Sequence, residues 1–349
     1  MVHDGRVFIR RARPTLRLIR EDLTSDWESP HFKRSLEAGR VDELSPMAEL
    51  PHPIIRKAAD SFREDPERDN FVQPIASSTQ VPLLEIKSAQ WRGGVWRDPG
   101  TGVCWLLVAG LAKGDHQDAD DFYVQIKRQD EQGKPERWLP SEADVRILKR
   151  ETAAHLRTEW ELGIQFEVLN GLRAIYDGGT YLFDVDHILP GKGRIASVEI
   201  SIVQERPVSG NADGEHFVPT DDIVVEFMPR SQYEGSNLLW QLIQRVLTSI
   251  EPPQQVWDRF GNTFSNLGEP GVWGSRIQTL SEAVEAKQLL FSEPGKFSHY
   301  THRKHLAGKT FEGSGVRSMC GVYFVPAQDH GALPTCSTCE EMYSLLPKE

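Results

Sequence analysis

Three of the four cysteines in the chain lie in its last thirty residues, at Cys320, Cys336 and Cys339. Cys336 and Cys339 are separated by two residues, and thiolates at this spacing can bind one tetrahedral metal ion from a single tight turn. Pro334 supplies turn chemistry just before them, and Cys320 with the glycine that follows begins a second ligand-bearing turn. These residues predict a zinc site that still needs a fourth ligand.

The fourth ligand is expected among the histidines of the same segment. We favour His299, with His302, His305 and His330 as competitors. A bound ion would also explain how so short a segment with so few apolar residues folds. The predicted cofactor is therefore a structural zinc ion in a module that spans residues 295–349.

The C-terminal segment also carries a longer pattern: a His-Tyr pair, then Cys-Gly, then a hydrophobic strand with proline, then Leu-Pro-x-Cys-x-x-Cys. This pattern resembles a small zinc-ribbon-like domain of unknown function that is common in actinobacterial proteins. The resemblance implies a metal and a compact β-rich fold, but no activity. A closed four-ligand site is structural because catalysis needs an open coordination position. The module is expected to bind a partner protein or nucleic acid.

A second group of chemically active residues lies in the segment LLEIKSAQWRGGVW, residues 83–96. Glu85 and Lys87 are alternate residues, so they share one face of a strand. A Glu-x-Lys tripeptide ends the motif of one class of metal-dependent nuclease. With Asp69 or Asp65 as the upstream ligand, the carboxylates would bind Mg²⁺ and Lys87 would orient the attacking water. The tripeptide alone is a weakly specific signal.

The same stretch belongs to an ordered series of elements between residues 53 and 128. The series begins with a helix (PIIRKAADSFREDPERD), a strand with a basic residue (LLEIKS) and a strand with an arginine (WRGGVW). It continues with a buried strand that ends in a glycine and a cation (LLVAGLAKGD) and closes with a helix that carries a tyrosine (DDFYVQIKR). This order resembles the RelE/ParE/HigB toxin superfamily of mRNA interferases and gyrase poisons. The resemblance implies a RelE-like α+β unit whose catalytic group is Lys87, Arg92, Lys113 and Tyr123.

These residue types suit RNA cleavage without a metal. Attack by the RNA's own 2′-hydroxyl needs a base for that hydroxyl, cations to balance the phosphorane charge, and an acid for the leaving oxygen. Lysine and arginine supply charge, and a lysine or tyrosine of shifted pKa can move protons. Trp91 and Trp96 could stack on an unpaired base, and Arg97 completes the predicted nucleic-acid-binding set.

The function implied by the resemblance is that of an RNA-directed endoribonuclease or a translation-inhibiting toxin-like protein of bacterial toxin–antitoxin or phage-defence type. Its partners would be RNA or the ribosome, and a protein antitoxin. The rival hypothesis is a non-catalytic protein that binds nucleic acid or protein, because the loop DHQDADD (115–121) between Lys113 and Tyr123 is acidic. Convergence of the cations in one open cleft would favour catalysis. Salt bridges to Glu85 and to this loop would favour a scaffold.

The overall composition indicates what kind of protein positions these residues. Its 349 residues are 39% hydrophobic and 26% charged, which is typical of a globular protein of more than one domain. No apolar run approaches the roughly 18 residues of a membrane helix, so we expect a cytoplasmic protein without membrane contact. The formal net charge of −11 argues against non-specific coating of duplex DNA but not against a local basic groove.

The pattern of apolar residues predicts a multidomain α+β protein. A helix from Pro53 that Pro66 stops, three strands in 81–112 and a helix after residue 120 make the RelE-like unit. A helix over 140–164 leads to strands in YLFDVDHIL, IASVEISIV and DIVVEFM, then to the helix NLLWQLIQRVLTSI. Residues 255–295 read as loop with one helix. The expected domains are a basic N-terminal region at 1–50, a RelE-like domain at 51–135, a mixed α+β domain at 140–290 and the zinc module at 295–349.

The predicted middle domain offers weaker signals. Asp184, Asp186 and His187 could be imagined as metal ligands because alternate residues of a strand share a face. An exposed acidic strand edge explains them more simply. Trp240 follows the apolar stripe of its helix and is expected in the core.

Overall fold

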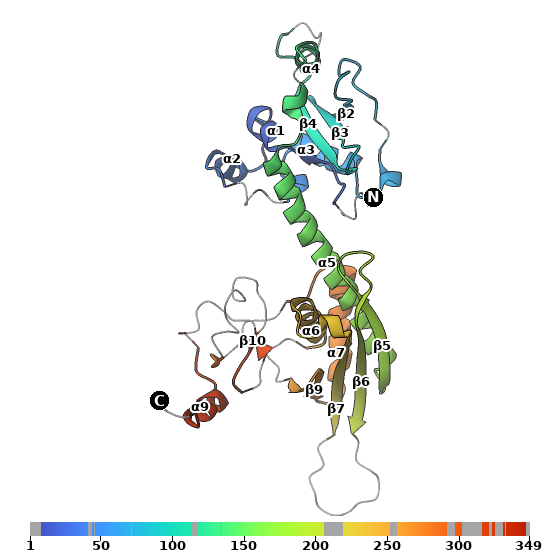
Figure 1. The fold of residues 1–349 in the computed structure, drawn as a ribbon, viewed down its shortest axis with the longest axis vertical. Coiled ribbons are helices and arrows are strands. Elements are labelled where there is room, and N and C mark those ends of the chain that lie inside the picture. Colours follow the sequence, from blue (N-terminus) through green and yellow to red (C-terminus); the bar gives the residue numbers. More distant parts are fainter. Residues whose placement is uncertain are drawn as a thin grey trace, which may run out of the picture. The chain divides into compact units, whose positions relative to one another are not determined.

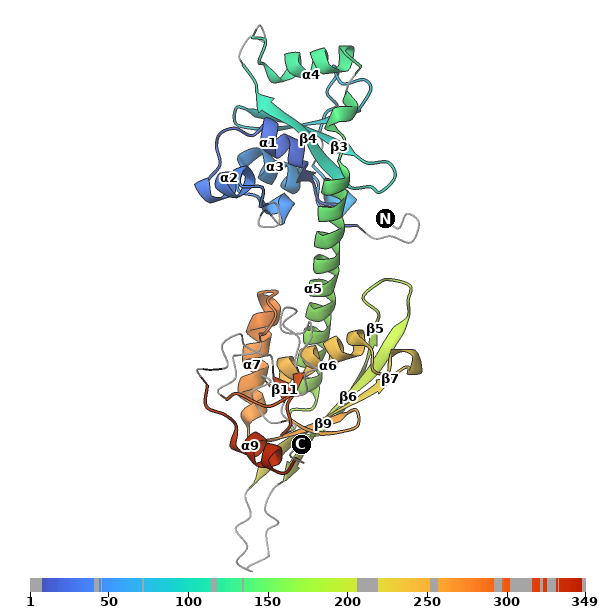
Figure 2. The same ribbon diagram turned by 60° about the vertical axis from the view of Figure 1, so that its left-hand side comes forward.

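A computed structural model describes residues 8–40, 44, 46–70, 72–113, 118–133, 135–205, 219–251, 257–291, 297–301, 316–320, 323–324, 331 and 333–346. The chain forms two compact units, Met1–His155 and Leu156–Glu349 (Figures 1 and 2). Both contain helices and sheet, which confirms the predicted α+β class at this level.

The first unit is built on a four-stranded sheet in the order β1-β4-β3-β2. The three predicted strands are confirmed as β2 (Leu84–Ser88), β3 (Trp91–Arg97) and β4 (Cys104–Leu111), which pair antiparallel. The short β1 (Arg13–Pro14) runs parallel to β4, so a segment that was predicted as a separate N-terminal region forms a sheet edge.

The two glycines of WRGGVW make close packing of β3 against its neighbours possible. A side chain at Gly93 would place its Cβ 2.9 Å from Ile86 and 2.9 Å from Leu106. At Gly94 the Cβ would lie 2.8 Å from Val108. Since real Cβ atoms do not approach so closely, these glycines are explained by packing within the sheet and not by a ligand.

Helices cover both faces of this sheet. One face packs against α1 (Leu16–Glu21), the 3-10 helix η2 (Met47–Glu49) and α3 (Pro53–Ser61). The other packs against α4 (Phe122–Glu131) and η4 (Pro135–Trp138). Cys104 and Leu106 face the first layer, and Trp105 and Leu107 face the second, so the predicted buried strand is confirmed as β4, with both of its faces covered. The unit also contains α2 (Pro30–Glu37) and η3 (Pro66–Arg68).

A buried ion pair ties the N-terminal strand to the long helix α5 (Glu142–Ala174). The guanidinium of Arg13 donates to the Glu151 carboxylate, and their side chains are only 1% and 6% exposed. Asp144, in the first turn of α5, accepts from the backbone N–H of Leu16 at 2.7 Å. These contacts join segments more than 120 residues apart, which sequence spacing could not indicate.

The second unit contains a five-stranded antiparallel sheet in the order β5-β6-β7-β9-β8. The predicted strands are confirmed as β5 (Gly179–Asp186), β6 (Arg194–Glu205) and β7 (Thr220–Pro229). The predicted helices are confirmed as α6 (Asn237–Ile250) and α7 (Val272–Glu285), with η5 (Ser231–Tyr233) before α6. They pack with the end of α5 on one face of the sheet.

Two strands of this sheet fall where the sequence was interpreted as loop. They are β8 (Asp258–Phe260) and β9 (Thr263–Gly268), an antiparallel hairpin that places β9 beside β7. Gly261 between them has φ 61°, a conformation that glycine adopts readily. The Gly-Asn pair at 261–262 was a hairpin signal that the interpretation of 255–295 as loop overlooked.

Among the described residues near the C-terminus, β10 (Val316–Arg317) pairs antiparallel with β11 (Tyr323–Phe324), and α9 (Ser337–Ser344) follows. Figure 1 labels β10 and α9, and Figure 2 labels β11 and α9. In the part of the chain that is described, no helix combines the length and the apolar character needed to cross a bilayer.

Candidate metal centre

The side chains of His299, Cys320, Cys336 and Cys339 lie together in the C-terminal module. One ligand atom from each falls within 4.8 Å of all the others. The Cys320 sulfur is 3.4 Å from His299 Nδ1 and 4.0 Å from the Cys336 sulfur, and the Cys339 sulfur is 3.6 Å from the same imidazole nitrogen. The structure therefore brings together the four residues that the sequence selected as ligands, in an arrangement that could bind a metal ion.

Backbone hydrogen bonds explain why segments far apart in sequence meet here. Ser298 donates to the carbonyl of Pro334 at 2.9 Å, and Cys336 donates to the carbonyl of Ser298 at 2.9 Å. On the other side of the same segment, Met319 donates to Tyr300 at 2.7 Å. His299 is thus held between the segments that carry Cys336 and Cys320.

The third thiol is placed by helix α9. Cys336 is its N-cap residue, and Cys339 lies in the first turn with no exposed surface. Free N–H groups and the helix dipole favour negative charge at this end of a helix, so they favour thiolates there. The two-residue spacing of Cys336 and Cys339 places both sulfurs at the same helix end.

Three of the six separations between the ligand atoms can be compared with those of a regular tetrahedral site. With Zn–S of about 2.3 Å and Zn–N of about 2.05 Å, a regular tetrahedron gives sulfur–sulfur edges of about 3.8 Å and sulfur–nitrogen edges of about 3.6 Å. The observed separations of 4.0, 3.4 and 3.6 Å lie close to these values. All four ligand positions are filled by protein atoms, so the arrangement resembles a closed site.

The surroundings of the ligands agree with metal binding. Burial lowers the pKa of His299, which leaves its imidazole in the neutral form that binds metals. Burial raises the pKa of the Cys339 thiol, so a buried thiolate there needs a nearby positive charge. The hydroxyl of Ser318, a residue that is only 4% exposed, lies 3.1 Å from the Cys320 sulfur. The sequence did not indicate this contact. The competing ligands His302, His305 and His330 lie outside the described residues.

The predicted catalytic group of the first unit has a different geometry. Lys87 and Arg92 are cross-strand partners on β2 and β3, and Lys87 Nζ lies 3.0 Å from Glu85 Oε2. The Tyr123 hydroxyl, on α4, donates to the other oxygen of Glu85. Burial, reinforced by Glu85, raises the pKa of Tyr123, and Arg92 acts in the opposite direction. Two of the four predicted residues, Lys87 and Tyr123, therefore contact one carboxylate, and Arg92 interacts with Tyr123.

The fourth residue is engaged elsewhere. Lys113 Nζ lies 2.6 Å from Asp118 and 4.0 Å from Asp120, both in the predicted acidic loop. Its hydrogen bond to Asp118 raises the pKa of Lys113 and lowers that of Asp118. Arg92 donates to the carbonyls of Ala89 at 2.9 Å and Trp91 at 3.0 Å. Each predicted cation thus has an acceptor within the unit itself.

The residues suggested for base stacking and for Mg²⁺ also have structural partners. Trp91 is 5% exposed and donates to Asp26 at 2.8 Å, whereas Trp96 is half-buried and packs against the core under α4. Arg97 lies 3.0 Å from Asp69, which also accepts from Arg10. Asp65 accepts from the backbone of η3. Among the described residues, the His/Cys/Asp/Glu group able to hold a metal ion is the C-terminal one.

Comparison with known proteins reaches the C-terminal module. Residues 292–346 match a family model described as protein of unknown function (DUF3039). No curated protein and no solved structure matches the chain. The matched span contains all four candidate ligands and does not extend to the predicted RelE-like unit at 51–135.

Proposed function

We propose that this protein is a non-catalytic binding protein of regulatory type, in which a structural zinc ion organises a C-terminal module that docks a partner protein. The observation that carries the proposal is the pairing of the predicted catalytic cations with acceptors of their own unit. Lys87 pairs with Glu85, and Lys113 pairs with Asp118. These are the salt bridges that favour a scaffold over a phosphate-binding cleft.

The donor set supports zinc as the ion and a structural role for it. Three thiolates and one imidazole are typical of structural zinc sites, and they leave no open position for a water or substrate. The free energy of binding such an ion becomes folding free energy of the module. The ion would therefore fix the relative positions of the His299 segment, the Cys320 turn and α9.

The surface beside this site supports a protein as the partner. The rings of Tyr300 and Tyr343 are in contact in a tilted arrangement with centroids 4.9 Å apart, and both residues are more than a third exposed. Met342 and Leu345 on the same C-terminal segment are 42% and 78% exposed. Clustered exposed apolar side chains mark protein interaction sites. The acidic pair at 340–341 in α9 is exposed beside them and would repel a phosphate backbone.

An RNA-directed endoribonuclease, the activity implied by the resemblance to the toxin superfamily, is the second candidate. The observation that favours it is that Lys87 and Tyr123 both contact Glu85 and that Arg92 interacts with Tyr123. In that function Arg92 would balance the phosphorane charge, and Tyr123 or Lys87 would move protons. A place in toxin–antitoxin or phage-defence biology, with RNA, the ribosome or an antitoxin as partner, belongs to this candidate.

The test is cleavage of labelled single-stranded RNA, and of mRNA on ribosomes, by the full-length chain with and without EDTA. The double variant Lys87→Ala/Arg92→Ala is compared with Lys127→Ala/Arg128→Ala, which removes two exposed cations of α4. Zinc content is measured in every sample. If the protein is a non-catalytic binding protein, the wild type and the two double variants should not differ in RNA cleavage.

Cleavage that survives EDTA and is lost only in the Lys87→Ala/Arg92→Ala protein would overturn the proposal in favour of the metal-free ribonuclease. Cleavage lost in EDTA while zinc is retained, and restored by Mg²⁺, would overturn it in favour of the Glu85-x-Lys87 metal nuclease.

A further inference from the structure

The five-stranded sheet of the second unit buries one face and leaves side chains of the other face exposed. The helices α5, α6 and α7 pack over the buried face, which includes Val198 and Phe227. The open face carries Leu182, Met228 and Phe260, which are 57%, 39% and 90% exposed. Since the water-facing positions of an antiparallel sheet are usually polar, these apolar side chains mark the open face as a candidate interface.

Two carboxylates lie side by side on this open face. Glu199 on β6 is the direct cross-strand partner of Glu226 on β7. Directly opposed side chains have Cβ atoms about 4.5–5.5 Å apart, and like charges at that distance destabilise a sheet. Neither carboxylate of this glutamate pair has a hydrogen bond or an ion pair within the described part of the chain. A bound cation would therefore relieve the repulsion.

The neighbours of the glutamate pair are largely apolar. Val224 and Met228 lie two residues to either side of Glu226, so they share its face of the sheet. Leu182 on β5 is the cross-strand partner of Glu199. A charge contact among apolar side chains is stronger than one surrounded by water. A ligand that covers these neighbours while it supplies a cation would thus gain from both.

Further acids surround the glutamate pair. Asp222 lies on the same face of β7, and one of its carboxylate oxygens is buried with no partner among the described residues. Asp184, in contrast, is neutralised by Arg194 at 2.7 Å. The excess of negative charge would repel a phosphate backbone, so the face suits a basic protein segment and not a nucleic acid.

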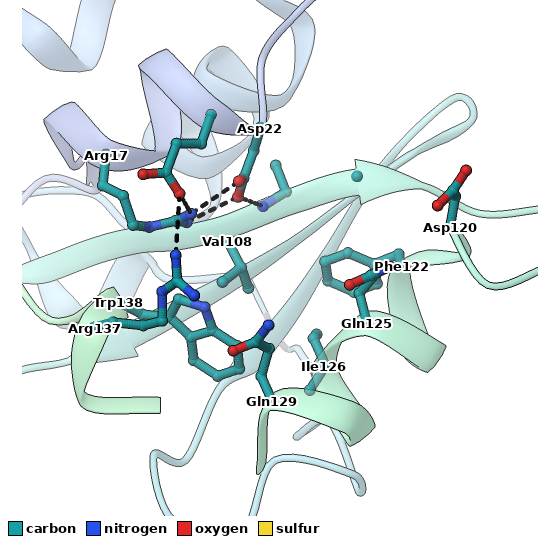
Figure 3. A pocket seen from close by; sticks show the side chains of 13 residues that line it. Arg17, Asp22, Val108, Asp120, Phe122, Gln125, Ile126, Gln129, Arg137 and Trp138 are labelled. Atoms are coloured by element: carbon teal, nitrogen blue, oxygen red, sulfur yellow. Dashed lines mark hydrogen bonds and ion pairs between the residues drawn. The ribbon is translucent and has the colours of Figure 1, made fainter. Parts of the chain in front are cut away.

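A pocket of the first unit between β4, α4 and η4 shows the opposite arrangement of charge. Arg17 makes two 2.9 Å hydrogen bonds to the Asp22 carboxylate (Figure 3). Arg137 lies 3.7 Å from Glu21 in the same lining. These charges already have partners within the protein, whereas the glutamate pair of the open face has none in the described residues.

We propose that the open face binds an amphipathic helix of a partner protein, which places an arginine between Glu199 and Glu226. A guanidinium presents its donors in a planar fork and is weakly hydrated, so it can bind both carboxylates at once. Two residues of a strand span about 6.7 Å, and four residues of a helix rise about 6 Å. A helix along β7 can therefore place apolar side chains, four residues to either side of the arginine, over Val224 and Met228. This second surface goes beyond the zinc-organised docking module and does not rest on it.

Calorimetric titration of the full-length chain with a hydrocarbon-stapled helical peptide tests the proposal. The peptide has one arginine with a leucine four residues to either side, and lysine and norleucine versions of the arginine position are compared. Glu199→Gln/Glu226→Gln removes the charges of the pair. Glu159→Gln/Glu285→Gln removes two exposed carboxylates of α5 and α7 and controls for overall charge. Calcium chloride is titrated in parallel, and urea unfolding confirms that each protein is folded.

We expect the arginine peptide to bind more tightly than the lysine peptide and about tenfold or more tightly than the norleucine peptide, the loss expected for hydrogen bonds to a charged group. Glu199→Gln/Glu226→Gln should weaken binding of the arginine peptide by the same factor. This variant should also unfold at a higher urea concentration than the wild type, because the repulsion is removed. Glu159→Gln/Glu285→Gln should bind like the wild type.

Three results of the titrations would overturn the proposal: no binding of the arginine peptide at millimolar concentration, equal binding of the norleucine peptide, or equal binding by Glu199→Gln/Glu226→Gln. Calcium binding that requires the glutamate pair, without peptide binding, would overturn it in favour of a metal site.

Discussion

The C-terminal ligand cluster was predicted from residue type and spacing, and the catalytic group of the first unit was implied by a resemblance; the side chains of the two groups are engaged differently. The sulfurs and the imidazole of the C-terminal cluster converge on one point within 4.8 Å of one another. The cations of the first unit turn to separate acceptors, as Lys87 does to Glu85 and Lys113 to Asp118.

The chemistry of the groups explains the difference. Three thiols and an imidazole gathered together have few ordinary partners, so their convergence indicates an ion. Lysine and arginine can be satisfied by any nearby carboxylate or carbonyl, so their spacing along strands is compatible with many surfaces. A cation pattern is therefore a weaker functional signal than a cysteine pattern of equal length.

Removing a thiol ligand should have the largest effect. We expect Cys339→Ser to lose the zinc ion and to unfold the module, because binding free energies of structural zinc amount to about 10 kcal/mol or more. Cys104→Ala, which changes a buried cysteine of the first unit, should keep the ion. Elemental analysis, combined with limited proteolysis of the C-terminal segment, measures both effects. Stoichiometric zinc in the Cys339→Ser protein would contradict the ligand assignment.

The next largest effect should come from the buried pair of Arg13 and Glu151. Glu151→Gln leaves the guanidinium without its charge partner, and breaking a buried pair typically costs about 3–5 kcal/mol. Glu142→Gln changes an exposed carboxylate of the same helix and should be neutral. Hydrogen exchange of the β4 amides during urea titration reports the stability of this unit. Equal protection in the two variants would show that the pair contributes nothing.

Lys87→Ala should have a much smaller effect on the stability of the same unit. Its side chain is 58% exposed, and exposed pairs contribute about 0–1 kcal/mol. The urea midpoint should move little compared with that of Glu151→Gln. A loss as large as that of the buried pair would mean that Lys87 is an essential structural cation, which would break the contrast between the two kinds of ion pair.

The smallest expected effect is on the titration of Tyr123. Burial and the hydrogen bond to Glu85 raise its pKa in the folded protein. The neutral phenol is thus favoured on folding, so its contribution to stability is present below about pH 10, the usual tyrosine pKa, and is lost as pH rises through the folded value. Carbon NMR of labelled tyrosine, with Tyr123→Phe to assign the signal, measures this pKa. A value at or below the usual one would contradict the contact with Glu85.

Local patterns predicted much of the fold. The apolar run of β4 predicted a buried strand. The stripe of apolar residues in NLLWQLIQRVLTSI predicted the helix α6, with its end before Pro252. The predicted helix at 140–164 extends to Ala174 because α5 keeps burying apolar residues such as Val168 and Leu172 in the second unit. A helix that buries different faces along its length has no single periodicity of apolar residues. The end of α5 therefore could not be predicted from the spacing of its apolar residues.

Long-range contacts account for what the sequence did not show. The candidate ligands were predictable because the cysteine spacing is typical of metal sites, and His299 lies in the same segment. The ion-pair partner of Lys113 depends on the conformation of the acidic loop that follows it. The partner of Arg13 depends on the pairing of β1 with β4. The meeting of Glu199 with Glu226 likewise depends on the register of β6 and β7, and no motif marks it.

X-ray absorption at the zinc edge of the purified full-length chain tests most directly whether the C-terminal cluster is a closed structural site. We predict a full zinc complement with three sulfur neighbours at about 2.3 Å and one nitrogen neighbour at about 2.05 Å. A shell that includes a water oxygen would contradict this, because an open position would make the site a candidate for catalysis. The absence of zinc would contradict the assignment of all four ligands.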